Sequence, residues 1–339
     1  MCAGGGSVPC SAVEKKRVRY MEKRITKKRI TKKTISGKNF TEERPFFGET
    51  GLRIEDCSFD VGESPFKEVA DLEITDTRFL GRYPVWYAKN VQICKTFFAD
   101  TCRAAIWYGE NISLSDCDYE GPKGLRRCNG VSITDVRFPK AVETLWFCRD
   151  VSLDRVYARG DYFLMNCENV KINGLTLEGK YSFDGCRNVE IRNSVLHTKD
   201  CFWNAEEITV YDSEIRAEYI GWNSKRITFV NCTIESLQGM CYIEELKLVN
   251  CRLENTSLAF EYATVDVESV TPIDSVINPL GGRIRAPRID KLILDPTKVD
   301  PEKTVIEAET GERLTEFDGI IPGESTAAAE ARESGTRST

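Results

Sequence analysis

The sequence predicts an all-β fold: a single-stranded, right-handed parallel β-helix, which is a solenoid, of about twelve coils. Three observations support this prediction. A segment of similar sequence recurs every 19 to 21 residues, each copy alternates apolar and polar residues, and equivalent positions in successive copies hold similar residues. A fixed period of this size is typical of a solenoid, because each repeat can bury its apolar face only against its neighbours.

The recurring segment is eight residues long and is first clear as LRIEDCSF at residues 52–59. Its apolar and polar residues alternate over four positions with the period of a β-strand, and its β-branched residues also favour strands. We therefore expect a strand in each copy: residues 52–59, 72–79, 91–98, 112–119, 131–138, 151–158, 170–177, 189–196, 208–215, 227–234 and 246–253, with a weaker copy that begins at Val265.

The other half of each repeat also has the pattern of a short strand, as in PVWYAKN and YFLMNCEN. Leucine-rich repeats have a similar period, but they need recurring leucines and a helical half, which this sequence lacks. A coil of about 19 residues with two or three short strands therefore indicates a parallel β-helix.

Small polar residues recur at equivalent positions of the repeat. One column holds Cys128, Cys148, Cys167 and Cys186, and another holds Cys57, Cys117, Cys232 and Cys251 together with Ser194, Ser213 and Thr77. Free cysteine behaves as a small, weakly polar filler, so we expect these columns inside the solenoid. Asparagines recur at turns, where they suit left-handed backbone and ladders of side-chain hydrogen bonds: Asn90, Asn111, Asn169 and Asn188.

The domain organisation follows from the repeat. Length alone suggests two domains for 339 residues, whereas the repeat predicts one. We expect a basic, flexible N-terminal extension at residues 1–34, the β-helix at 35–295, and a C-terminal tail at 296–339 that is disordered from about residue 323. The segment NPLGG at residues 278–282 breaks the repeat, and RIRAPRIDKLILD after it is expected to form the last coils and a cap.

The composition excludes several classes of protein. Hydrophobic residues make up 41% of the chain, yet no run of 18 apolar residues exists, so no transmembrane helix is expected. The chain start lacks the apolar stretch of an export signal, so we expect a cytoplasmic protein whose 14 cysteines stay reduced. With one histidine and no CxxC pair, we expect neither a metal nor a cofactor.

Basic residues are concentrated near the N-terminus. Residues 14–33 hold 11 of the 47 lysine and arginine residues and 2 of the 53 acidic residues. Such a segment can bind nucleic acid or an anionic membrane. Because Tyr20 is its one aromatic residue, a solvated tail is the simpler interpretation, and nucleic acid is not expected to bind elsewhere.

Several longer stretches of the chain match one protein family both in residue identity and in order. They include FTEERPFFG, SPFKEVADLEI, RYPVWYAKNV, CRAAIWYGENI, GKYSFDGCRNVEI and TKDCFWNAEEITVYDS. In them the chain resembles the domain-of-unknown-function 3737 family, an uncharacterised and mainly bacterial family, over about residues 35–295. The resemblance implies a pectin-lyase-like, right-handed β-helix. It implies no activity, substrate or catalytic residue. Family members usually begin shortly before the FTEER segment, so residues 1–20 are expected to be an extension of the natural protein or an upstream start before Met21.

Aromatic residues are concentrated at one phase of the repeat. All five tryptophans fall in one column: Trp86, Trp107, Trp146, Trp203 and Trp222. The same column also holds Arg126, Met165 and Asp184, which a buried column would not accept, so we expect it on or near the surface. The next column is similar, with Tyr87, Tyr108, Arg127, Phe147 and Asn166. Three positions before the tryptophans lie Tyr83, Tyr162, Tyr181 and Tyr219, and one position further back lie Arg82, Arg103 and Lys180.

The tryptophans, these four tyrosines and these three basic residues are the predicted ligand-binding residues. Exposed rings stack on sugar faces, and the flanking charges bind hydroxyl or acidic groups, so the pattern predicts an elongated groove for a carbohydrate or similar polyhydroxylated ligand. Three alternatives remain open. The rings can form a structural ladder, lie under a terminal segment, or form a non-enzymatic protein-interaction or scaffold surface. The sequence predicts no oligomeric state.

A catalytic function is a further hypothesis. Glycoside hydrolysis needs two carboxyl groups about 5–9.5 Å apart. Asp161, Asp184 and Asp200 are expected on adjacent coils of the aromatic face, so they are the predicted catalytic residues. An enzyme of this kind would be a glycoside hydrolase or a polysaccharide lyase, and the sequence does not decide whether the chain is an enzyme.

Overall fold

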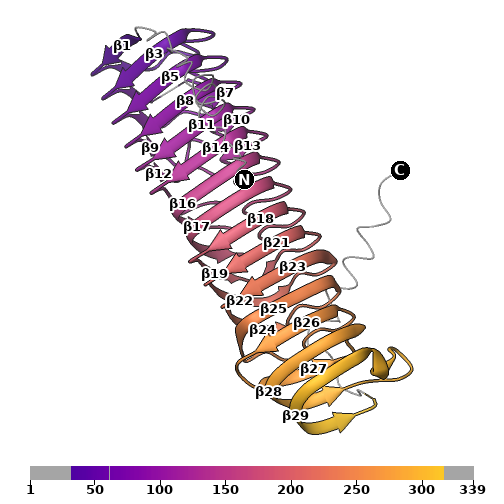
Figure 1. The fold of residues 1–339 in the computed structure, drawn as a ribbon. Helices are drawn as coiled ribbons and strands as arrows, with labels where there is room; N and C mark the ends of the chain where they lie inside the picture. Colours follow the sequence, from indigo (N-terminus) through magenta and orange to yellow (C-terminus); the bar gives the residue numbers. More distant parts are fainter. Residues whose placement is uncertain (1–31, 61, 317–339) are drawn as a thin grey trace, which may run out of the picture. The chain divides into compact units, whose positions relative to one another are not determined.

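The computed structural model of the chain describes residues 32–60 and 62–316. The fold below is that of the unit that begins at Lys33. Its described residues form parallel strands stacked coil upon coil (Figure 1), with one short 3-10 helix at Pro301–Lys303. The predicted all-β solenoid is therefore confirmed, while its handedness stays a prediction.

The longest series takes one strand from each coil. Pairing is parallel and in register, with Lys33 beside Leu52, Leu52 beside Leu72, and Leu72 beside Val91. The series consists of β1 (Lys33–Ser36), β3 (Thr50–Glu55), β5 (Ala70–Thr75), β8 (Lys89–Cys94), β11 (Glu110–Ser115), β14 (Asn129–Thr134), β16 (Arg149–Arg159), β17 (Glu168–Gly179), β18 (Arg187–Arg192), β21 (Glu206–Tyr211), β23 (Ser224–Val230), β25 (Ile243–Glu254), β26 (Thr264–Ser269), β28 (Gly281–Ile293) and β29 (Thr304–Leu314).

The described part therefore has fifteen coils rather than about twelve. The twelve predicted strands run from β3 to β26, β28 lies in the segment RIRAPRIDKLILD that was expected to form the last coils, and β1 and β29 are additional. At the C-terminal end Val265 pairs with Gly282 and Gly282 pairs with Thr304, steps of 17 and 22 residues that depart from the repeat. The stack thus continues into residues 296–339, where the sequence predicted a tail. Residues 1–31 and 317–339 lie outside the described residues.

Two further rows of short strands complete the coils. The second row consists of β2 (Asn39–Phe40), β4 (Ser58–Phe59), β6 (Arg78–Phe79), β9 (Phe97–Phe98), β12 (Asp118–Tyr119), β15 (Arg137–Phe138), β19 (Val195–Thr198), β22 (Glu214–Ile220), β24 (Thr233–Gln238) and β27 (Ile273–Ile277). β20 (Asp200–Cys201) follows β19 in the same coil and pairs with the end of β22. The third row is a separate sheet of β7 (Val85–Trp86), β10 (Ile106–Trp107) and β13 (Leu125–Arg126). These strands lie in the second half of the repeat, where the sequence predicted a short strand.

The interior is a continuous core of stacked apolar side chains, and the cysteine columns lie within it. All eight predicted column cysteines are buried. Their thiols bond to backbone carbonyl groups of the preceding coil: the Cys167 thiol lies 3.0 Å from Leu145 O, and the Cys186 thiol lies 3.0 Å from Leu164 O. Burial also raises the pKa of Cys232 to about 12. The prediction that these residues fill the interior is confirmed.

The predicted asparagine ladders are present at the turns. The Asn111 side-chain amide donates to Asn90 at 3.0 Å, and the Asn188 amide donates to Asn169 at 2.8 Å. All four backbones are left-handed, with φ between 53 and 58°. Asparagine tolerates this conformation better than most residues do, so it occupies turns at which the backbone of other residues would be strained.

Candidate functional site

The tryptophans lie half-buried along one side of the stack. Their column, here called the tryptophan column, consists of Trp86, Trp107, Arg126, Trp146, Met165, Asp184, Trp203 and Trp222. The rings of Trp86 and Trp107 stack 5.1 Å apart with 4° between their planes. Their indole N–H groups donate to Ala104 O at 2.7 Å and to Lys123 O at 3.0 Å. The two rings therefore cover one another, and both N–H groups are bonded to the next coil. This pair thus has a structural role in the stack.

Arg126 continues the ladder between two tryptophans. Its guanidinium lies 5.2 Å from the centre of the Trp107 ring and 4.2 Å from that of Trp146. Glu143 pairs with Arg126 and, at 2.7 Å, with Lys123. Partial burial opposes ionisation of Glu143, but the hydrogen bonds from Lys123 and Arg126 lower its pKa. The two basic side chains thus share one carboxylate, and the cluster joins three coils.

The residues that follow the tryptophan column form the outer column. Each backbone N–H of this column, from Tyr87 to Asn204, donates to a carbonyl of the tryptophan column in the next coil. Every residue of the outer column has a left-handed backbone, with φ between 50 and 68°. The outer column consists of Tyr87, Tyr108, Arg127, Phe147, Asn166, Gly185, Asn204, Asn223 and Tyr242.

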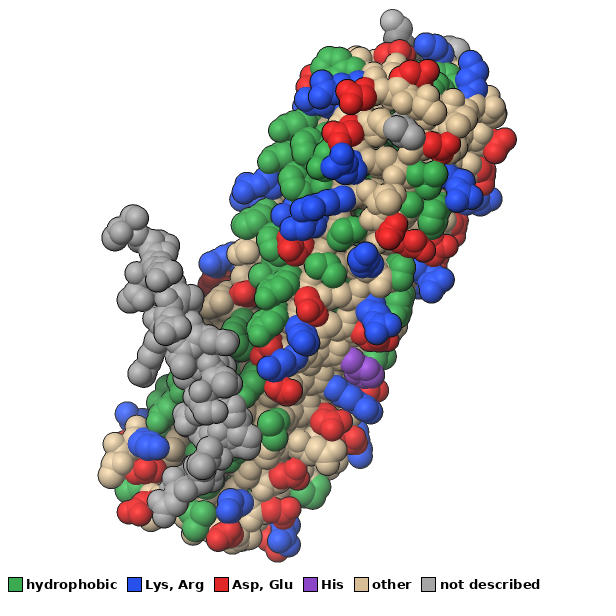
Figure 2. Space-filling view, turned by 180° about the vertical axis from the view of Figure 1, so that it is seen from behind, with side chains coloured by type: hydrophobic (Ala, Val, Ile, Leu, Met, Phe, Trp, Pro, Cys, Tyr) green, Lys and Arg blue, Asp and Glu red, His purple; other side chains and the backbone are tan. Residues whose placement is uncertain are grey.

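The outer column changes character along the stack. Tyr87 and Tyr108 stack 4.7 Å apart with 2° between their rings, and the Tyr87 and Phe147 side chains are 45% and 44% exposed. After Phe147 the column changes to asparagine and glycine, with the Asn223 amide donating to Asn204 at 2.9 Å. Hydrophobic side chains line one side of the stack in Figure 2, with charged side chains beside them.

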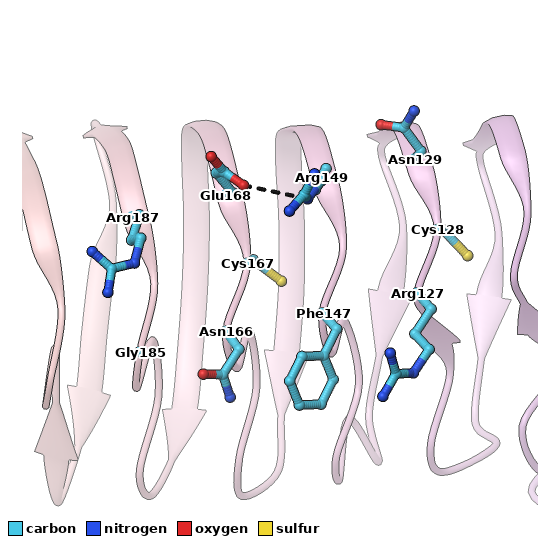
Figure 3. A pocket seen from close by; sticks show the side chains of 10 residues that line it. All are labelled: Arg127, Cys128, Asn129, Phe147, Arg149, Asn166, Cys167, Glu168, Gly185 and Arg187. Atoms are coloured by element: carbon cyan, nitrogen blue, oxygen red, sulfur yellow. Dashed lines mark ion pairs between the residues drawn. The ribbon is translucent and has the colours of Figure 1, made fainter.

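A pocket of about 540 Å³ opens where the rings of the outer column end. Figure 3 shows the Phe147 ring between Arg127 and Asn166, with Arg149 and Arg187 at the far side of the pocket. A side chain at Gly185 would begin 2.4 Å from the Asn166 Oδ1 atom, so glycine keeps this space open. The lining residues are Arg127, Cys128, Asn129, Phe147, Arg149, Asn166, Cys167, Glu168, Gly185 and Arg187.

Ion pairs neutralise two of the three arginines in the pocket. Arg149 lies 3.3 Å from Glu168, and Arg187 pairs with Glu206, which also pairs with Arg226. Arg127 has no acidic partner among the residues that the structure describes, and its guanidinium lies 4.9 Å from the centre of the Phe147 ring. The amide groups of Asn129 and Asn166 make no side-chain hydrogen bond within the same described ranges. One guanidinium, two amides and one ring thus remain available for a ligand.

The three predicted catalytic aspartates occupy different columns. Asp200 in β20 pairs in register with Tyr219, next to the tyrosines that precede the tryptophan column. Asp184 lies in the tryptophan column, where its carboxylate accepts a bond from the Asn204 amide at 3.0 Å. The carbonyl of Asp161 accepts the Glu143 N–H, which places Asp161 one position before the tyrosine column. Their catalytic role stays a prediction.

Asp200 has the most unusual environment of these carboxylates. It is 2% exposed, and its Oδ2 atom has no hydrogen-bond partner among the described residues. Burial raises the pKa of Asp200 to about 6; Lys199 opposes this shift, Glu218 adds to it, and Lys180 opposes it more weakly. The Ser182 hydroxyl and the Trp203 indole N–H are also buried without a hydrogen-bond partner in the described part of the chain. Two adjacent coils therefore hold three unsatisfied polar atoms.

The other predicted ligand-binding residues lie beside the tryptophan column. Together with the tryptophan column and the outer column they form what is here called the aromatic side. Tyr83 packs 4.8 Å from Trp86, and the rings of Tyr162 and Tyr181 stack 5.1 Å apart. Tyr219 lies in the same column as Tyr181. Arg82, Arg103 and Lys180 are exposed, and Arg82 pairs with Glu63 at 2.8 Å.

The pocket residues were not predicted as a group from the sequence. Arg127, Phe147 and Asn166 belong to the predicted second aromatic column, whereas Arg149, Arg187 and Gly185 were not among the predicted site residues. The usable signal was the change from rings to asparagine and glycine after Phe147 within one column.

The fold and the aromatic side define a β-solenoid protein with an exposed ring-lined corner. A family described as protein of unknown function (DUF3737) matches residues 33–307, and the chain belongs to this family. No curated protein matches the chain. Among solved structures, PfbA, a surface adhesin of Streptococcus pneumoniae, is 6% identical, with 83% of this chain and 80% of that chain covered and a TM-score of 0.31. A likeness this weak carries no argument about function.

The described residues contain no helix that is long and apolar enough to cross a membrane. Within the same residues no group of three or more histidine, cysteine, aspartate or glutamate side chains is placed to hold a metal ion.

Proposed function

We propose that the protein binds a carbohydrate or similar polyhydroxylated ligand along its aromatic side, and that a sugar ring stacks on Phe147 in the pocket. The observation that carries this proposal is the exposed Phe147 ring beside two amides whose side chains make no hydrogen bond to the residues that the structure describes. The C–H face of a sugar packs on an aromatic ring, and each amide can both donate to and accept from sugar hydroxyls. An aromatic wall with a few convergent polar groups is the usual composition of a ligand site.

The exposed rings of the outer column support a binding role. Left-handed backbone costs about 1–2 kcal/mol for residues other than glycine and asparagine. The chain places asparagine or glycine at Asn166, Gly185, Asn204 and Asn223, yet it keeps exposed rings at Tyr87, Tyr108 and Phe147. Left-handed backbone recurs at many turns of the stack, including buried Leu164 and Phe183, so the feature that points to binding is the exposure of the rings, which opposes folding.

The stacked rings favour a different role for the rest of the aromatic side. The faces of Trp86 and Trp107 cover one another, as do those of Tyr87 and Tyr108. A sugar cannot stack between rings at these separations, so these rings act as a structural ladder. Phe147 is the last ring before Asn166 and Gly185, so no ring of the next coil stacks on it.

The experiment is a glycan array probed with the full chain, with Phe147→Asn and Tyr87→Asn as matched variants. Both residues are exposed rings with left-handed backbone in one column, but Tyr87 does not line the pocket. We expect the wild-type chain and Tyr87→Asn to bind the same glycans, and Phe147→Asn to lose them. If the wild-type chain binds no glycan, or if Phe147→Asn binds as well as the wild type, the proposal is wrong.

A further inference from the structure

The charge of the pocket is unbalanced at one residue. Arg149 is matched by Glu168, as the dashed line in Figure 3 shows. Arg187 and Arg226 share Glu206, and Arg226 also lies 3.3 Å from Glu207, so two arginines face two glutamates. Arg127 adds a positive charge that no acidic group in the described part of the chain balances.

The position of Arg127 relative to the ring is suited to a second ligand group. Its guanidinium lies over Phe147, and its five N–H donors are not used by any described carboxylate. A guanidinium presents a planar pair of donors that matches an oxyanion, and such charge-assisted pairs are about twice as strong as neutral hydrogen bonds. A ligand on the Phe147 ring would therefore meet this charge at its edge.

We infer that the pocket binds a sugar unit carrying an oxyanion (a carboxylate, a sulfate or a phosphate), with the anion on Arg127 and the sugar ring on Phe147. This inference rests on the proposed function and names its ligand class. Asn129 and Asn166 would bind the remaining hydroxyls. Arg149 and Arg187 keep their glutamates, so Arg127 supplies the unbalanced positive charge.

Asparagine is the natural replacement for testing Arg127. Three outer-column positions already hold asparagine with left-handed backbone, so Arg127→Asn removes the charge without a new backbone demand. Arg137→Asn is the control for removal of an exposed arginine, and Arg137 differs from Arg127 in lying 3.7 Å from Asp118. Arg137 is also exposed and lies over a ring, 6.0 Å from the centre of Tyr157, but it lies in β15 outside the pocket.

The experiment is isothermal titration calorimetry of the full chain with matched forms of one oligosaccharide. These are a uronic acid oligosaccharide, the same molecule with its carboxyl groups reduced to alcohols, and sulfated and phosphorylated derivatives of the reduced form. We expect the wild type and Arg137→Asn to prefer at least one charged form over the reduced form by about ten- to hundredfold. Arg127→Asn should bind that charged form no better than the reduced form, and added salt should weaken the preference.

The outcomes separate this inference from the proposed function. The charged form that binds best identifies the oxyanion. If the wild type binds all forms equally and Phe147→Asn weakens all of them, the sugar site stands and the oxyanion inference is wrong. A preference that persists in Arg127→Asn also overturns the inference. Failure to bind any form overturns it as well, and the glycan array then decides the proposed function separately.

Discussion

Replacing Asp200 with asparagine should stabilise the protein at neutral pH. Asp200 is 2% exposed, its Oδ2 atom lacks a partner among the described residues, and its pKa is raised from 3.8 to about 6. Burial causes this shift by disfavouring the charged carboxylate. An aspartate whose pKa is higher in the folded state binds more protons when folded, so the free energy of unfolding falls as the pH rises from about 4 to about 6.

The magnitude follows from the shift. Each pKa unit corresponds to about 1.36 kcal/mol, so a shift of about two units destabilises the folded protein by about 3 kcal/mol above pH 6. Asparagine has the same shape and carries no charge, so Asp200→Asn removes this penalty. We expect the variant to match the wild type to within about 1 kcal/mol near pH 4 and to exceed it by up to about 3 kcal/mol at pH 7.5.

The assay is urea unfolding, followed by circular dichroism, at several pH values between 4 and 7.5. Asp135→Asn is the control of opposite sign, because the hydrogen bond from Arg155 lowers the pKa of Asp135. Since Asp135 therefore titrates mostly below pH 4, the difference between that variant and the wild type should stay nearly constant from pH 4 to 7.5. A difference between Asp200→Asn and the wild type that stays constant over this pH range would refute the reasoning, since a constant difference cannot come from titration of Asp200.

Three further predictions concern the columns. Phe147→Asn should change the unfolding temperature little, because relief of left-handed strain, about 1–2 kcal/mol, offsets the loss of a cation–π contact of about 0.5–1 kcal/mol and of the buried part of the ring; a fall of many degrees in a thermal scan would show that the ring is mainly structural. Asn188→Ala should lose about 1–3 kcal/mol in urea unfolding, and Asn188→Gly less, because glycine keeps the left-handed backbone and loses only the bond to Asn169; equal losses would contradict this cause. Among the twelve described cysteines, Cys94 should be the one that iodoacetamide modifies in the native protein, as read by mass spectrometry, because the others are buried and burial raises the pKa of Cys117 and Cys241 to about 12; rapid modification of Cys167 would show that the core opens.

The stack and its interior could be predicted because a solenoid converts sequence period directly into register. Residues 19 to 21 apart become hydrogen-bonded neighbours, so the columns of Cys167 and Asn188 are visible in the order of the residues alone. This relation fails where the period changes. β28 and β29 pair over steps of 17 and 22 residues, and β1 has only four residues, so the predicted coil count is low at both ends.

The orientation of the rings was harder to predict, because one residue separates a covered ring from an exposed one. Trp107 is half-buried and Tyr108 is 38% exposed. Period alone assigns both to the same face. The left-handed backbone at Tyr108 turns the chain at that point, and this turn decides which side chain points outward. A pattern of asparagine and glycine at the same phase is the sequence signal for such a turn.

The pocket depends on which charges find partners between coils. Another column of the repeat lies two residues after the outer column. In it, basic and acidic side chains of adjacent coils form ion pairs, such as Lys89 with Glu110 at 3.0 Å and Lys225 with Glu244 at 2.8 Å. Arg149 and Arg187 belong to this row and are neutralised within it. Arg127 lies in the outer column instead, where its neighbours are Tyr108 and Phe147. The repeat therefore places Arg149 and Arg187 next to glutamates and Arg127 next to an aromatic ring. The charge of Arg127 is unbalanced because of the column in which it lies.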